Sequence, residues 1–190
     1  SHFSVLSKLR KICDGGKEFE ENAKTLATGE LIRKIHENNE KVIVFSYYLD
    51  PLYGLEELLK TINIPYVKFF DVDVDAREES IDTFRSDATV TVFIASSRIA
   101  SEGLTLTEAN NVIFLNRWWN PSSNSQARDR VVRIGQEKPV TIYNLFCVDT
   151  VEERVTQILK NKNDIYSKVT DGLVDDLSSL TKEIIDEPKN

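Results

Sequence analysis

The sequence has few cysteines, no apolar run of membrane-spanning length and no excess of positive charge. Its two cysteines, Cys13 and Cys147, lie in apolar stretches outside any CxxC or His-rich pattern. This spacing disfavours a zinc site and indicates buried thiols in a reducing compartment. No basic-then-apolar signal pattern opens the chain, and no segment is long enough to cross a bilayer. We therefore expect an intracellular protein with no bound metal and no membrane partner.

The charge balance limits the possible partners further. The net charge is -7 over 190 residues, and the sequence pI is near 5.0. A negative chain does not bind nucleic acid tightly through its overall charge, because the phosphate backbone is negative as well. Any contact with DNA must therefore come from particular residues.

Short apolar runs alternate along the chain with segments of helical periodicity. The expected strands are 41–45, 65–70, 88–95, 111–115 and 140–148. The expected helices are 3–13, 18–37 with a break near Thr28-Gly29, 51–62, 75–86, 121–134, 150–165 and 176–186. Strand cores without polar alternation predict a three-layer α/β domain, with helices on both faces of a mostly parallel sheet. Ligands of such folds meet the loops at the carboxyl ends of the strands.

Residues 126–136, which read QARDRVVRIGQ, form the most informative segment. On a helix, Gln126, Arg130 and Arg133 fall at positions i, i+4 and i+7, so they share one face. Two guanidiniums held on one face suit phosphate oxygens, because their planar forks form bidentate bonds. The same spacing also suits a solvated helix in which Asp129 pairs with Arg133.

The longer string WWNPSSNSQARDRVVRIGQ, residues 118–136, resembles the last helicase motif of Swi/Snf-type ATPases in superfamily two. In that family a WNP segment precedes a helix reading QAxxRxxRIGQ. The resemblance implies that Arg130 and Arg133 are arginine fingers that reach ATP on another lobe, with Gln126 as a further catalytic residue. Val132 departs from the family, which usually has histidine at this position.

The match extends over nearly the whole chain and implies the C-terminal RecA-like, or P-loop NTPase-like, lobe of such an ATPase. By this resemblance, residues 1–40 are leading helices and residues 41–148 form the RecA-like lobe. Residues 149–190 are then a C-terminal helical extension that packs on the lobe.

The resemblance also implies contacts with the DNA backbone from residues that close expected strands or precede the arginine helix. These residues are Ser46, Ser96, Ser97, Arg98, Trp119 and Asn120. Ordinary turn chemistry suits the serines equally well. Core packing is the alternative for Trp119, and Asn120 also suits a helix N-cap.

Residues 94–106 match the strand-then-loop motif of the family. Within that loop the resemblance implies cofactor-binding positions at Glu102, Gly103 and Thr105, although Thr105 replaces the usual asparagine and Glu102 also suits a solvated loop. Residues 71–77 stand where the family has an Asp-Gly turn followed by arginine. Val72 replaces that glycine, so we expect the turn to be rebuilt.

The sequence contains no GxxxxGK[ST] loop and no DEAH-like string. We expect the full-length protein to bind ATP and magnesium mainly on a first lobe that is missing here. The fragment alone is then expected to bind nucleotide weakly or not at all and to be inactive.

The implied partners are the first lobe, double-stranded DNA along which the two lobes translocate, and a nucleoprotein substrate. Two alternatives to this motor lobe stay open. One is a standalone, non-enzymatic RecA-like module for protein interaction. The other is a lobe of another superfamily-two helicase that acts on RNA or unwinds DNA.

Overall fold

The computed structural model describes residues 2–15, 22–98, 106–116, 136, 138–154 and 156–157, with side chains from Lys8 onward. The chain falls into two compact units. The larger unit spans residues 15–145, and the smaller unit combines residues 1–14 with residues 146–190. The three-part division that the resemblance implies stays a prediction.

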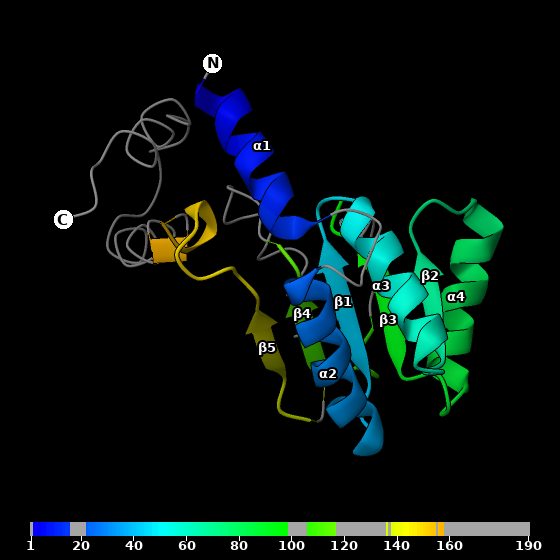
Figure 1. Ribbon diagram of the computed structural model, residues 1–190. Helices are drawn as coiled ribbons and strands as arrows, with labels where there is room; N and C mark the ends of the chain where they lie inside the picture. Colours follow the sequence, from blue (N-terminus) through cyan, green and yellow to red (C-terminus); the bar gives the residue numbers. More distant parts are fainter. Residues whose placement is uncertain are drawn as a thin grey trace, which may run out of the picture. The chain divides into compact units, whose positions relative to one another are not determined.

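The larger unit is built on a five-stranded sheet with the strand order β2-β3-β1-β4-β5 (Figure 1). The strands are β1 (Val42–Ser46), β2 (Tyr66–Phe69), β3 (Val92–Ser96), β4 (Asn111–Phe114) and β5 (Thr141–Asn144). Every neighbouring pair is parallel. The predicted α/β fold with a parallel sheet is therefore confirmed.

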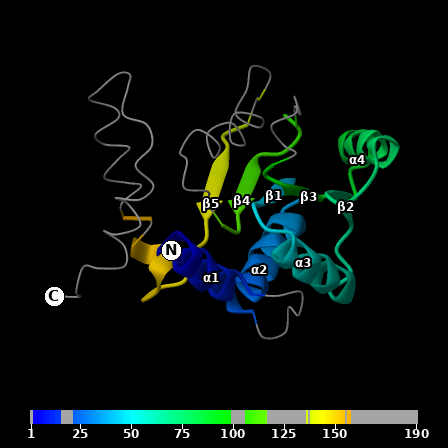
Figure 2. The ribbon, with the colours of Figure 1, turned by 90° about the horizontal axis from the view of Figure 1, so that it is seen from above.

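Helices of the larger unit cover both faces of this sheet. Viewed from above, α2 (Ala23–Glu37) and α3 (Asp50–Thr61) lie on one face and α4 (Val74–Ser86) lies on the other (Figure 2). Val44 packs beneath α2 and α3, whereas its neighbours Ile43 and Phe45 pack in the opposite core with Phe84 of α4. Successive strand residues point to opposite faces. Because both faces are buried, the strands are apolar throughout and show no polar alternation.

Helix α2 runs without interruption, so the expected break near Gly29 is wrong. Gly29 is buried, and a Cβ atom placed on it would lie 2.5 Å from Cδ2 of Leu58 in α3. The glycine thus permits α2 and α3 to pack closely, and packing overrides its low helix propensity. The helix begins after Asn22, whose side chain accepts hydrogen bonds from the backbone N–H groups of Lys24 and Thr25 at 2.9 and 3.0 Å. Residues 16–21 lie outside the described residues.

The smaller unit contains α1 (His2–Asp14) and a helical segment that begins at Val151. The hydroxyl of Thr150 accepts a hydrogen bond from the backbone N–H of Glu152 at 3.2 Å, which is the geometry of an N-cap. The expected helices 121–134 and 176–186 fall outside the described residues. No helix in the described part of the chain is long and apolar enough to span a bilayer.

Candidate functional site at the carboxyl edge of the sheet

Two serines meet where the central strands of the sheet end. Ser46 is the last residue of β1, and Ser96, the last residue of β3, is its partner in register. Both side chains are buried, and the backbone N–H of Ser97 donates to the carbonyl of Ser46 at 2.9 Å. The loops that leave β1 and β3 therefore start side by side. The structure brings together four residues predicted to contact DNA: Ser46, Ser96, Ser97 and Arg98.

The hydroxyl of Ser46 is used inside the protein. It donates to the carbonyl of Tyr48 at 2.7 Å, and it accepts from the backbone N–H of Tyr48 at 3.2 Å. It also accepts from the side-chain amide of Asn116 at 2.9 Å. Ser46 is 0% exposed. Its hydroxyl therefore holds the loop after β1 in place through these internal hydrogen bonds.

Asn116 is a residue of this edge that sequence reasoning missed. Its side chain is buried, and its Oδ1 atom accepts the backbone N–H of Tyr47 at 2.7 Å. Asn116 thereby links the segment after β4 to the loop after β1. Its place directly after an apolar strand was the signal in the sequence, because polar residues at the carboxyl ends of parallel strands gather at one edge.

Arg98 is the exposed cation of this edge. Its guanidinium carbon lies 4.3 Å from the centroid of the Tyr47 ring. The Tyr47 and Tyr48 rings in turn meet edge to face, with centroids 5.4 Å apart. A cation over an aromatic face is held by attraction to the ring quadrupole. The edge thus presents an oriented guanidinium beside the half-buried Ser97, an arrangement suited to binding an anion such as a phosphate.

The turn after β2 offers a carboxylate instead of a cation. Asp71 adopts a left-handed backbone conformation with φ of 51°, and its carboxylate accepts a hydrogen bond from the hydroxyl of Tyr53 in α3. This bond, together with burial, raises the pKa of Tyr53 to about 12. Asp73 then caps α4 by accepting the backbone N–H of Ala76 at 2.9 Å. The left-handed residue of this turn is Asp71, and position 72 is a valine where the resembled family has glycine. The turn therefore differs from an Asp-Gly turn, as we expected.

Gln136, the last residue of the QARDRVVRIGQ segment, has a structural role at the opposite end of the sheet. Its Nε2 atom donates to the carbonyls of Thr107 and Ala109 at 3.0 and 2.7 Å, just before β4. Its Oε1 atom accepts the backbone N–H of Lys138 at 3.0 Å. Gln136 therefore holds the segment before β5 against the loop that enters β4.

The other predicted site residues lie outside the described part of the chain, and their roles stay predictions. They are Gln126, Arg130, Arg133, Glu102, Gly103, Thr105, Trp119 and Asn120. At the carboxyl edge the described residues present the exposed guanidinium of Arg98 beside the half-buried Ser97, and the turn after β2 adds the exposed carboxylates of Asp71 and Asp73. The guanidinium and the Ser97 hydroxyl can hold an anion in place.

Comparison with known proteins gives consistent relatives. The family described as helicase conserved C-terminal domain matches residues 23–135. An uncharacterised ATP-dependent helicase of Mycoplasma genitalium is 35% identical over 186 residues, which cover 95% of this chain and 18% of that protein. The chain therefore spans less than a fifth of that relative's length.

Solved structures share the fold. The C-terminal part of the Fun30 ATPase domain superposes with a TM-score of 0.73 and 30% identity, over 96% of this chain and 62% of that one. The Swi2/Snf2 ATPase core of Sulfolobus solfataricus in complex with double-stranded DNA superposes with a TM-score of 0.69 and 28% identity. That match covers 88% of this chain and 37% of the other.

Proposed function

We propose that this chain is one motor lobe of an ATP-dependent translocase on double-stranded DNA. The chain belongs to the family of helicase conserved C-terminal domains, and it is the second RecA-like lobe of a Swi/Snf-type ATPase. The main supporting observation is the exposed guanidinium of Arg98 over the Tyr47 ring, at the carboxyl edge of the parallel sheet. A complete motor needs a second lobe that binds ATP, and it would act inside the cell on a nucleoprotein substrate.

In this proposal Arg98 and Ser97 contact phosphates of one DNA strand. Contacts to phosphate position a protein on the duplex without reading its sequence, as a translocase requires. Ser46 and Ser96 are buried, so they act by positioning the loops and not by direct contact. Trp119 and Asn120 take the role of further DNA contacts in this proposal. The likeness to an ATPase core in complex with double-stranded DNA supports this assignment.

Arg130 and Arg133, with Gln126 on the same helical face, act on ATP held by the first lobe. Their charge stabilises the transferring phosphoryl group, a contribution of about 10³- to 10⁵-fold in rate for an arginine finger. Glu102, Gly103 and Thr105 take the role of cofactor-binding positions in this proposal. ATP and magnesium bind mainly to the first lobe, so the present chain alone is inactive.

The arginine fingers are tested in the full-length protein by Arg130→Ala and Arg133→Ala. We expect each variant to lose ATP hydrolysis by at least about 10³-fold, with affinity for duplex DNA changed less than about twofold. Arg33→Ala is the matched control, because Arg33 is an exposed arginine of α2 that pairs with Glu30 at 3.1 Å. An equal loss of DNA affinity in Arg130→Ala, or ATP hydrolysis by the isolated 190-residue chain, would contradict the proposal.

The DNA contact is tested by Arg98→Ala in the same protein. Loss of one phosphate contact should weaken binding to all sequences equally and reduce the slope of log affinity against log salt by about 1. Stimulation of ATP hydrolysis should be stronger with duplex DNA than with single strands or RNA. A preference for RNA would favour another class of superfamily-two enzyme.

A further inference from the structure

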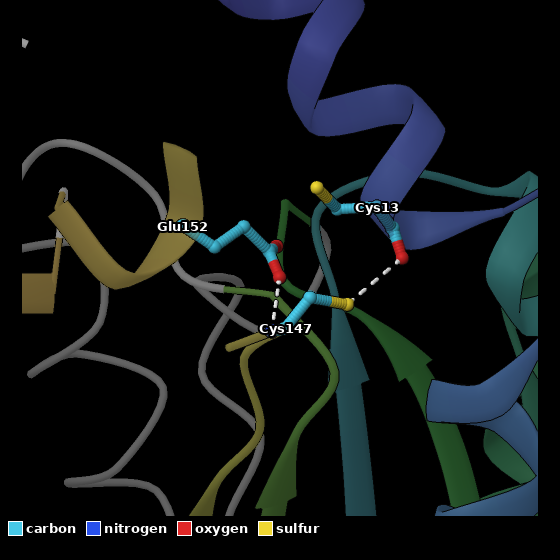
Figure 3. Close-up of side chains that lie close together, drawn as sticks. All are labelled: Cys13, Cys147 and Glu152. Carbon is cyan, nitrogen blue, oxygen red and sulfur yellow. Dashed lines mark hydrogen bonds between the residues drawn. The ribbon is translucent and has the colours of Figure 1, made fainter. Parts of the chain in front are cut away.

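The smaller unit brings together two cysteines and a buried carboxylate. Cys13 is the last residue but one of α1, and Cys147 follows β5, 134 residues along the chain. Glu152 lies in the helical segment that begins at Val151 and is 4% exposed. The two sulfur atoms and a carboxylate oxygen of Glu152 all lie within 4.8 Å of one another (Figure 3). Among the described residues, this is the group of metal-ligand side chains with such spacing.

Local hydrogen bonds hold the three side chains in this arrangement. The backbone N–H of Cys147 donates to Oε2 of Glu152 at 2.9 Å, and the thiol of Cys147 donates to the carbonyl of Cys13 at 3.6 Å. The hydroxyl of Thr150 donates to the carbonyl of Cys147 at 2.6 Å, which closes the turn between Cys147 and the helix. The Glu152 carboxylate therefore points toward the cysteines, as Figure 3 shows.

We propose that Cys13, Cys147 and Glu152 bind a zinc-type divalent metal ion. Thiolate and carboxylate groups are ligands that zinc uses in proteins. Tetrahedral zinc with Zn–S bonds of about 2.3 Å holds its sulfur ligands about 3.8 Å apart. Donor atoms that already lie within 4.8 Å need to close by about 1 Å or less. Water or another ligand completes the fourth position.

Metal binding changes the charge of the site. Each of the two thiols loses a proton to water, and the glutamate binds as its carboxylate. The three ligands then carry three negative charges against two positive charges on the metal, so the site retains one negative charge. The cation offsets the like-charge repulsion between two thiolates and a carboxylate.

The buried carboxylate beside the two thiols gives a cation a third ligand, which a disulfide would leave unused. Metal binding would tie the first helix of the chain to the segment after β5, and its binding free energy would add to the stability of the smaller unit.

Titration of the reduced 190-residue chain with Zn²⁺ against a chromophoric chelator tests the site. We expect one zinc per chain, a higher midpoint of thermal unfolding, and weaker binding as the pH is lowered, because binding releases protons. Cys13→Ser and Cys147→Ser should abolish binding, and Glu152→Gln should weaken it by about tenfold or more. Glu153→Gln is the matched control from the next position of the same helix and should bind as the wild type does.

A second measurement does not depend on the folding of any variant. Zn²⁺ should slow alkylation of the two thiols in the wild-type chain, and a chelator should restore the rate. The proposal is overturned if the Cys13→Ser/Cys147→Ser double variant binds as much zinc as the wild type. It is also overturned if zinc gives no protection while the two cysteines form an intramolecular disulfide in air.

Discussion

The side-chain amide of Asn116 donates a hydrogen bond to the hydroxyl of Ser46 at 2.9 Å, so the end of β1 is joined to the segment that follows β4. The same asparagine accepts the backbone N–H of Tyr47 at 2.7 Å. Ser46 and Asn116 are both buried. This pair therefore fixes the path of the loop that presents Tyr47, and through it Arg98, at the carboxyl edge.

Asn116→Ala should lower the free energy of unfolding by about 1–3 kcal/mol, because it leaves the partly buried N–H of Tyr47 without its acceptor. Ser46→Ala should also destabilise the chain. The double variant should lose less than the sum of the two, with a coupling energy of about 0.5–3 kcal/mol. Urea unfolding measures all three, and Asn38→Ala, at an exposed position after α2, serves as the control. Strictly additive losses would show that the two side chains act independently.

Replacement of Tyr47 should affect DNA binding through the orientation of Arg98. In the full-length protein, Tyr47→Phe keeps the ring and should leave duplex affinity nearly unchanged. Tyr47→Leu removes the cation–π contact, worth about 0.5–1 kcal/mol at an exposed site, so affinity should fall about 2- to 5-fold. Fluorescence anisotropy with labelled duplex DNA measures the effect. Equal losses in both variants would assign the role to the tyrosine hydroxyl and not to the ring.

The close approach of α2 and α3 predicts that Gly29→Ala lowers the free energy of unfolding, although alanine favours a helix. Alanine favours a helix over glycine by about 1 kcal/mol, but a Cβ at this position would meet Leu58 at 2.5 Å. Overpacking of this kind costs about 1–3 kcal/mol. We therefore expect a net loss of up to about 2 kcal/mol in the free energy of unfolding.

Measuring Gly29→Ala in a second variant chain separates the effect of packing from the effect of helix propensity. In a Leu58→Ala chain the obstructing side chain is absent, so Gly29→Ala should become stabilising, by up to about 1 kcal/mol. Thermal or urea unfolding of the four chains gives the comparison. A stabilising effect of Gly29→Ala in both backgrounds would mean that the helices separate without cost.

The carboxylate of Glu40 should contribute to the loss of folding stability at low pH. Its carboxylate accepts hydrogen bonds from the side-chain amides of Asn110 and Asn111, both at 3.0 Å, and these bonds lower its pKa below the ordinary 4.5. Because the folded pKa lies below the unfolded one, this stabilisation is complete above about pH 4.5 and is lost as the pH falls through the folded value.

Glu40→Gln should therefore be less stable than the wild type at pH 7, and the difference should shrink as the pH is lowered below about 4.5. Chemical denaturation at a series of pH values measures this difference. Glu37→Gln, at an exposed position of α2, is the control for the loss of one negative charge. A gap between wild type and Glu40→Gln that is constant from pH 7 to pH 3 would contradict the assignment.

Local patterns in the sequence were sufficient to predict the elements that the structure describes. Uninterrupted apolar runs mark strands buried on both faces, and such strands belong to parallel sheets covered by helices. Two strand boundaries were wrong: β5 ends at Asn144 although we expected a strand to residue 148, and β3 begins at Val92 although we expected a strand from residue 88. The second error has a local cause. There the side chain of Asp87 accepts hydrogen bonds from the backbone N–H and the hydroxyl of Thr89, and this turn delays the strand.

The sequence by itself determined the family, through the ordered string that ends in Gln136, and it located the edge at which Ser46 and Ser96 lie. Only the tertiary structure decided that Ser46 is buried, that Asn116 holds its loop, and that Cys13 lies beside Cys147. Periodicity records which face of an element is covered, because it depends on near neighbours along the chain. It does not show which distant segment packs against that face. The contacts of Asn116, of Gly29 and of the two cysteines all join distant segments, so they appear only when the chain is folded.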